Sequence, residues 1–142
     1  MQRVMKTTLP INVRAYEIDA MGVVSNIVYV KWLEDARRAF LDKFYPYDEM
    51  VTAGISPVMM KNEITYKKPL RITDRPTATL WITRLTKMRW EIYTEFTCEG
   101  ILHCSAVQNG CFVEIETGRP TRVPKALMAA YEQDVSDMQK KA

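Results

Sequence analysis

The sequence contains one histidine, three cysteines and no cysteine pair of the CxxC type. An odd number of thiols (Cys98, Cys104 and Cys111) without metal-ligand spacing is typical of reduced cysteines in a reducing compartment. One histidine and scattered thiols do not supply a ligand set, so we expect no metal site. His103 and Cys104 are neighbours in a strand-like segment, and their side chains should point to opposite faces. This arrangement argues against a catalytic Cys/His pair.

Long apolar runs and strong charge are also missing. No run approaches the roughly 18 apolar residues of a transmembrane helix, and Met1–Val13 lacks the apolar stretch of a signal peptide. We therefore expect a cytoplasmic protein that does not bind a membrane. The net charge of +3 is too small to indicate a nucleic-acid partner. With 47% hydrophobic residues, the chain of 142 residues is expected to form one globular domain over residues 1–142.

One segment has helical periodicity. Ser25 or Asn26 can cap the helix, and the apolar side chains that share one face are Tyr29, Leu33, Ala36 and Phe40. The helix should end near Phe44, because Pro46 disfavours helix in the residue before it. The following segment, Tyr45–Pro57, is expected to be a loop or an otherwise broken segment.

The remaining segments alternate with period two, which predicts strands. Thr8–Tyr16 precedes the helix, and four strands follow it: Val58–Lys67, Pro76–Leu85, Met88–Cys98 and Ile101–Ile115. A bulge is expected near Asn109–Gly110. A turn at Thr117-Gly118 leads to Pro124 and a short closing helix, Lys125–Gln133. This order predicts an α+β fold in which the long helix covers one face of an antiparallel sheet.

Asp19 stands between the first predicted strand and the long helix. It is followed by the small-residue turn Ala20-Met21-Gly22 and then by Ser25-Asn26. This order puts a carboxylate beside a helix N-terminus, where free N–H groups can hold a developing oxyanion. A carboxylate next to such donors is half of a hydrolytic site. The alternative is a structural turn, because Asp is common where a strand bends into a helix.

This motif and the order of the elements resemble the hotdog-fold acyl-CoA thioesterases, specifically the 4-hydroxybenzoyl-CoA thioesterase-like family. The Gly22-Val23-Val24 form of the turn also resembles plant acyl-lipid thioesterases. The matching residues extend over nearly the whole chain: Val13-Arg14, Asp19–Gly22, Asn26, Tyr29, Glu34–Arg37, Ile64–Leu70, Thr117–Pro120 and Val123-Pro124. The resemblance implies a hotdog fold, with the sheet wrapped around one long helix. It also implies homodimers or homotetramers with active sites at the subunit interface, and hydrolysis of acyl-CoA or acyl-carrier-protein thioesters without cofactor or metal.

The resemblance also implies roles for individual residues. Asp19 matches the family's catalytic Asp, which acts as nucleophile or as general base for water. The backbone N–H of Val23, directly after Gly22, matches the donor that polarises the thioester carbonyl. Asn26 is expected to cap the helix and to orient the substrate. Val23 and Ser25 stand where many relatives carry His and Asn, which favours a fatty acyl substrate over an aromatic one.

Further positions are candidates for substrate contacts. Tyr29 is expected in the core, with a hydroxyl that can reach the acyl carbonyl. Met59 and Met60 follow the helix, where the family's acyl pocket is lined, and they favour a flexible apolar tunnel. Tyr66, Lys67 and Lys68 end the second strand, and the two lysines are candidates for the phosphates of coenzyme A.

Three alternatives remain open at this point. Glu34 is a competing carboxylate, because a second branch of hotdog thioesterases uses a Glu on the helix. Its position off the Tyr29 face favours a pair with Arg37 or Arg38 instead. A hotdog dehydratase would need a His paired with an acid at the site, and His103 is far along the sheet. A non-catalytic acyl-CoA-binding module is the alternative from another functional class.

Overall fold

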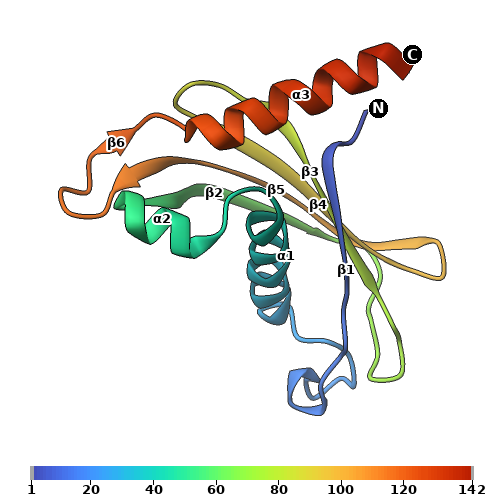
Figure 1. The fold of residues 1–142 in the computed structure, drawn as a ribbon. Helices are drawn as coiled ribbons and strands as arrows, with labels where there is room; N and C mark the ends of the chain where they lie inside the picture. The colour runs from blue at the N-terminus through green and yellow to red at the C-terminus, as the bar shows by residue number, and fades with distance from the viewer. Residues whose placement is uncertain (1, 142) are drawn as a thin grey trace.

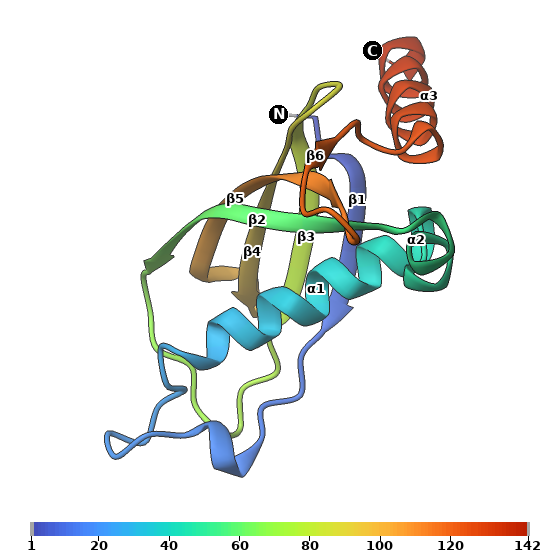
Figure 2. The same ribbon diagram turned by 90° about the vertical axis from the view of Figure 1, so that its left-hand side faces the viewer.

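The computed structural model describes residues 2–141, and its central feature is a curved antiparallel sheet that wraps around one long helix, α1 (Figures 1 and 2). The strand order is β1-β3-β4-β5-β2, and a sixth strand pairs with β5. The elements in chain order are β1 (Val4–Pro10), the 3-10 helix η1 (Ala15–Glu17), α1 (Val28–Phe44), α2 (Tyr47–Ala53), β2 (Ile55–Tyr66), β3 (Thr77–Leu85), β4 (Trp90–Cys98), β5 (Ile101–Glu114), β6 (Pro120–Thr121) and α3 (Lys125–Lys141). The predicted α+β class is confirmed.

The helix α1 lies across the concave face of the sheet (Figure 2). The four side chains predicted to share one face of this helix are all buried: Tyr29, Leu33, Ala36 and Phe40. The helix ends at Phe44, as predicted. It begins at Val28, however, and no side chain caps it. The predicted cap by Ser25 or Asn26 is therefore wrong, because the Ser25 backbone carbonyl accepts the N–H of Val28 at 2.9 Å and closes the first turn.

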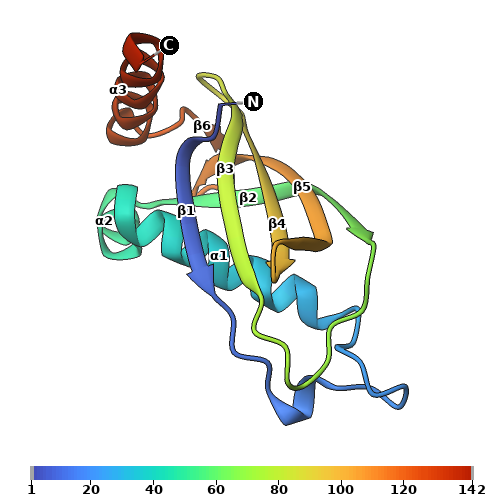
Figure 3. The same cartoon turned by 90° about the vertical axis from the view of Figure 1, so that its right-hand side faces the viewer.

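The first strand is shifted toward the N-terminus relative to the prediction of Thr8–Tyr16. β1 covers Val4–Pro10 and pairs with β3 (Figure 3). Ile11 and Val13 are buried, as their alternation suggested, but they lie beyond the strand. The ladder ends where Pro10 faces Thr77. One more bond follows, from the Ile11 N–H to the Pro76 carbonyl at 2.9 Å, and Pro76 has no N–H to return it.

The strands after α1 lie close to their predicted positions, and the bulge occurs on the opposite strand from the one expected. The register moves from Met59↔Gly110 to Lys61↔Asn109, so the extra residue is Met60 on β2. On β5, the residue paired with Met59 beside this bulge is Gly110, and the space around it has no room for a side chain. A Cβ on Gly110 would collide with the Val58 carbonyl oxygen and with the ring of Trp90.

Two helical segments differ from the prediction. The segment Tyr45–Pro57, expected to be irregular, contains α2. The closing helix, expected to end at Gln133, continues to Lys141 and is as long as α1. Asp134 lies in this extension, and its carboxylate accepts the backbone N–H of Met5 at 2.6 Å. Figure 3 shows α3 beside the N-terminal end of β1. None of the helices within residues 2–141 is long and apolar enough to cross a membrane.

Candidate active site

Asp19 begins a closed turn that precedes α1. Its backbone N–H donates to the Val23 carbonyl at 2.9 Å, and its carbonyl accepts the N–H of Gly22 at 3.0 Å. Its carboxylate oxygen Oδ1 accepts the N–H of Met21 at 2.9 Å and that of Val23 at 3.4 Å. Gly22 has a φ of 78°, a left-handed conformation that a side chain disfavours. Asp19, Gly22 and Val23 are thus brought together by hydrogen bonds within the turn, between backbone groups and from backbone N–H groups to Asp19 Oδ1.

The turn differs from the expected helix N-terminus in one respect. Because α1 begins at Val28, the amide of Val23 is part of the turn and is not one of the free N–H groups of the helix. Its N–H is directed at Asp19 Oδ1 across a long hydrogen bond. Bonds of this length are weak and are easily exchanged for a better acceptor.

A buried carboxylate, Glu17, fastens this turn to the rest of the protein. Glu17 Oε1 accepts the backbone N–H of Arg14 at 2.7 Å, and Oε2 accepts the indole N–H of Trp32 at 3.1 Å. The Glu17 carbonyl also accepts the N–H of Ser25 at 3.0 Å. Sequence reasoning missed Glu17, and no sequence signal points to it, because its role depends on Trp32 on the next helix. The turn is therefore anchored on both sides.

The turn and its flanks expose large apolar side chains. Tyr16, Met21 and Ile27 are 82%, 81% and 72% exposed, respectively. Figure 2 shows this segment projecting beyond the N-terminal end of α1. The three most exposed large apolar side chains among residues 2–141 therefore all belong to this segment.

Asn26 and Tyr66 meet at the N-terminal end of α1. The Tyr66 hydroxyl donates to the Asn26 backbone carbonyl at 3.1 Å, which connects the end of β2 to the start of the helix. Tyr29 is buried beside them, with its ring centroid 5.5 Å from that of Tyr66 and 5.6 Å from that of Phe96. Burial, with smaller contributions from Cys104 and Tyr66, raises the pKa of the Tyr29 hydroxyl. Tyr29 is thus a core residue with a protonated hydroxyl.

His103, Cys104 and the two candidate lysines lie around the end of β2. Burial raises the pKa of the Cys104 thiol to about 12, so this thiol is not a nucleophile near neutral pH. His103 Nδ1 is 3.2 Å from the carbonyl oxygens of Lys68 and Pro69. The backbone N–H groups of Lys67 and Lys68 both donate to the His103 carbonyl. The imidazole therefore holds the exposed lysine segment in place.

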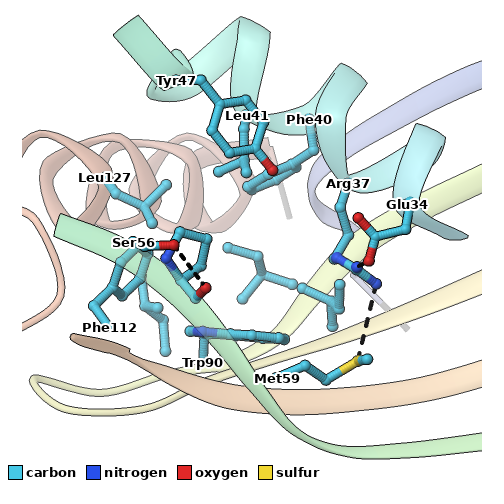
Figure 4. A pocket seen from close by; sticks show the side chains of 14 residues that line it. Glu34, Arg37, Phe40, Leu41, Tyr47, Ser56, Met59, Trp90, Phe112 and Leu127 are labelled. Atoms are coloured by element: carbon cyan, nitrogen blue, oxygen red, sulfur yellow. Dashed lines mark hydrogen bonds and ion pairs between the residues drawn. The ribbon is translucent and has the colours of Figure 1, made fainter. Parts of the chain in front are cut away.

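Met59 lies in a pocket at the C-terminal half of α1 (Figure 4). We name this cavity of about 200 Å³ the Trp90 pocket. Its interior is apolar and aromatic, formed by Phe40, Leu41, Ile82, Leu85, Trp90, Ile92, Phe112 and Leu127. Its remaining lining is Glu34, Arg37, Tyr47, Ser56, Pro57 and Met59. Met60, the bulged residue, is outside the lining and contacts Arg89 through its sulfur.

Within one chain, the Trp90 pocket and the Asp19 turn are far apart. Val28 and Arg37 are nine positions apart on α1, which corresponds to about 14 Å along the axis. The core between them is filled, since Leu33, Thr94 and Phe96 are fully buried. The structure thus brings Asp19, Gly22 and Val23 together, and Asn26 with Tyr66. It does not bring Met59 to either group.

Glu34 is found where its alternative role was expected. It forms an ion pair with Arg37, three residues further along the helix. Its side chain is 61% exposed. Among residues 2–141, no cluster of three or more His, Cys, Asp or Glu side chains could hold a metal ion.

Comparisons with known proteins agree with this geometry. Residues 13–131 match the profile of a family described as "Thioesterase-like superfamily". A protein of Aquifex aeolicus named "Putative esterase" is 30% identical over 117 residues, which cover 82% of this chain and 90% of that protein. A protein of Bacillus subtilis named "Putative acyl-CoA thioesterase YneP" is 29% identical, covering 82% of this chain and 86% of the relative. A DHNA-CoA thioesterase from Staphylococcus aureus has a similar fold, with a TM-score of 0.82 at 23% identity over 95% of this chain and 91% of that one.

Proposed function

This chain belongs to the thioesterase-like superfamily and is a thioester hydrolase with the hotdog fold, and we propose that Asp19 and the backbone amide of Val23 carry out its reaction on acyl-CoA. The observation that carries this proposal is the Asp19 turn. An exposed carboxylate and a directed backbone N–H lie within one closed loop, inside the region that matches the family.

The proposed reaction uses the two groups for different tasks. The thioester carbonyl replaces Asp19 Oδ1 as the acceptor of the Val23 N–H, which frees the carboxylate and polarises the carbonyl carbon. The carboxylate then removes a proton from water, and the hydroxide adds to that carbon. The tetrahedral oxyanion collapses, breaks the C–S bond and expels the thiolate, which takes up the proton. In direct attack, Asp19 adds to the carbonyl carbon, the C–S bond breaks and the thiolate leaves as the mixed anhydride forms. Water then cleaves the anhydride to the acid and the free Asp19 carboxylate.

Substrate contacts follow from the same arrangement. We assign the acyl chain to the Trp90 pocket through Met59, and the CoA phosphates to the exposed Lys67 and Lys68 beside Tyr66. The acyl group is a fatty chain in this proposal. A cavity of about 200 Å³ is small for a ligand site, since sites for drug-sized ligands occupy roughly 300–1,000 Å³. The proposal is therefore limited to short or medium chains, on CoA or on a carrier protein.

Two chains are needed to join the Asp19 turn to the pocket. β2 is a long strand at the edge of the sheet, and all residues from Val58 to Glu63 are exposed. An exposed edge of this length is a template for pairing with another chain. Antiparallel pairing of two β2 strands would set the Met59 end of one beside the Tyr66 end of the other. The proposed unit is a homodimer, in which each turn serves the pocket of the other chain.

The oligomer proposal has a direct test. Sedimentation equilibrium of the intact protein should give a dimer or a multiple of it. A Val58→Asp, Met60→Asp double variant, with charges on the exposed edge, should sediment as a folded monomer with little thioesterase activity. A monomer with full activity would contradict a site shared between chains.

The catalytic assignment is tested by Asp19→Asn, with Asp42→Asn as the matched control on a second exposed carboxylate, which lies outside the lining of the Trp90 pocket. Hydrolysis of a panel of acyl-CoAs, followed by release of free thiol, should fall at least roughly a hundredfold in Asp19→Asn, the scale of a lost acid–base group. Asp42→Asn should retain activity within a factor of about three, since single exposed ion pairs contribute little. A roughly hundredfold loss in Glu34→Gln instead would assign the reaction to that competing carboxylate. Near-normal kcat/KM in Asp19→Asn would remove this residue from the mechanism.

A further inference from the structure

Arg37 occupies an unusual position at the rim of the Trp90 pocket. Its side chain is 17% exposed, although it is charged, and it lies on the same turn of α1 as the apolar lining. Figure 4 shows Arg37 and Glu34 together at one side of the cavity, with Met59 across from them. The guanidinium is therefore held at the boundary between the apolar interior and the solvent.

The hydrogen-bonding groups of Arg37 are only partly satisfied. Nη2 donates to Glu34 Oε1. Nη1 is directed at the sulfur of Met59, 3.9 Å away, and a thioether is a weak acceptor. Within residues 2–141, no oxygen accepts a hydrogen bond from Nη1. A largely buried guanidinium with a free edge is suited to an oxygen acceptor that comes from a ligand.

The rest of the pocket indicates which apolar group such a ligand carries in addition to its oxygen atoms. Trp90 and Phe112 supply flat apolar surface, and Leu127 closes the side toward α3. The indole N–H of Trp90 donates to the Cys111 carbonyl at 3.0 Å, which fixes the ring. An apolar cavity of about 150 Å³ accepts benzene, so a cavity of about 200 Å³ has room for one ring or a short alkyl chain.

We propose that the Trp90 pocket binds a small carboxylic acid, with its apolar tail on Trp90 and Phe112 and its carboxylate on the free edge of the Arg37 guanidinium. Carboxylate and guanidinium are complementary in charge and in planar geometry. This inference rests on the proposed function in one respect: a carboxylic acid is the product that thioester hydrolysis releases. The pocket that accepts the acyl chain thus also retains the acid after hydrolysis, so that the product inhibits the enzyme.

Glu34 weakens the binding of this carboxylate. Its carboxylate occupies the Nη2 edge of Arg37 and repels a second anion nearby. Its side chain is 61% exposed, so it can move into the solvent when a ligand arrives. The pair therefore weakens product binding without preventing it, and removing the charge of Glu34 should make the acid bind more tightly.

The test measures binding directly, by titration calorimetry on the intact protein with hexanoate and phenylacetate. The matched neutral probes are hexanamide and phenylacetamide, which keep the tail and lose the charge. The acids should bind the unmodified protein at least roughly tenfold more tightly than the amides, the discrimination expected of a charge-assisted hydrogen bond. Arg37→Met should remove that preference, and Glu34→Gln should increase it about threefold. Arg38→Met, on the exposed face of the same helix, should leave it unchanged.

The same titrations separate this inference from the catalytic proposal. Asp19→Asn should still bind hexanoate more tightly than hexanamide, because Arg37 provides this preference, although its hydrolysis is lost. If Asp19→Asn hydrolyses thioesters normally and still binds the acids more tightly than the amides, only the catalytic assignment fails. Equal affinity for acid and amide in the unmodified protein would overturn the acid site. An unchanged acid preference in a folded Arg37→Met or Arg37→Lys variant would assign the carboxylate to another residue and would also overturn it.

Discussion

The Asp19 turn and the Trp90 pocket are built in opposite ways. The turn consists of five consecutive residues, 19–23, and its geometry is set by backbone hydrogen bonds and by one glycine with positive φ. The pocket takes its lining from three helices and four strands, and it exists only when all of them are packed. The comparison shows that the proposed chemical groups depend on local structure, whereas the proposed selectivity depends on the whole fold.

The tight packing of the pocket predicts that a single added methyl group costs more beside Trp90 than at a glycine with open space around it. Gly110→Ala in β5 should lower the free energy of unfolding by about 3 kcal/mol, because the new Cβ collides with the Val58 carbonyl and the Trp90 ring. Urea unfolding measures this loss. A glycine elsewhere in the chain with open space around it, such as Gly100, is the control and should lose about 1 kcal/mol on the same substitution. Equal losses of stability in the two variants would mean that Val58 and Trp90 move aside from the new Cβ at little cost in free energy.

Glu17 connects the two regions, since it fastens the Asp19 turn to α1. In Glu17→Gln, one of the two donors (the Arg14 N–H or the Trp32 indole N–H) would face an amide NH₂ instead of an oxygen. We expect a loss of about 2 kcal/mol in the free energy of unfolding, typical of a buried polar mismatch. The thioesterase kcat should fall as well, while hexanoate binding in the pocket should stay unchanged. A parallel loss of kcat and of hexanoate affinity in Glu17→Gln would show that the turn and the pocket are not independent.

The turn itself is tested by a matched pair of glycines. Gly22 and Gly118 both have positive φ, 78° and 72°, and an added Cβ on either has no neighbour within 4 Å. Gly22→Ala and Gly118→Ala should each lose about 1 kcal/mol of stability through backbone strain. Only Gly22→Ala should lower kcat/KM, by at least roughly tenfold, because the Val23 amide is re-aimed. Similar kcat/KM values in the two variants would argue that the Val23 N–H has no part in the reaction.

The predictions from sequence succeeded where local pattern decides the structure. The buried face of α1 and the four later strands follow from periodicity, and the end of α1 at Phe44 follows from Pro46. The helix cap, the extent of α3 and the place of β1 were predicted wrongly. The extent of α3 and the place of β1 depend on partners distant in sequence, since Asp134 on α3 accepts the N–H of Met5. The cap was wrong for a local reason, because the Ser25 carbonyl closes the first turn instead of a side chain. The same division applies to the candidate site. The closeness of Asp19 to Gly22 and Val23 and the Glu34–Arg37 pair are local and follow from the sequence. The bond from Trp32 to Glu17 and the full lining of the Trp90 pocket join distant segments and do not.

Asn26 gives the smallest expected effect, and it separates the two roles that the sequence predicted for this residue. Its backbone carbonyl is what accepts the Tyr66 hydroxyl, and the start of α1 has no side-chain cap. Asn26→Ala should therefore change the free energy of unfolding by less than about 0.5 kcal/mol. Tyr66→Phe, which removes the donor to that carbonyl, should cost about 1 kcal/mol. A lower kcat/KM in Asn26→Ala at unchanged stability would favour contact of this amide with the substrate, whereas a loss of stability near 1 kcal/mol would restore the predicted cap.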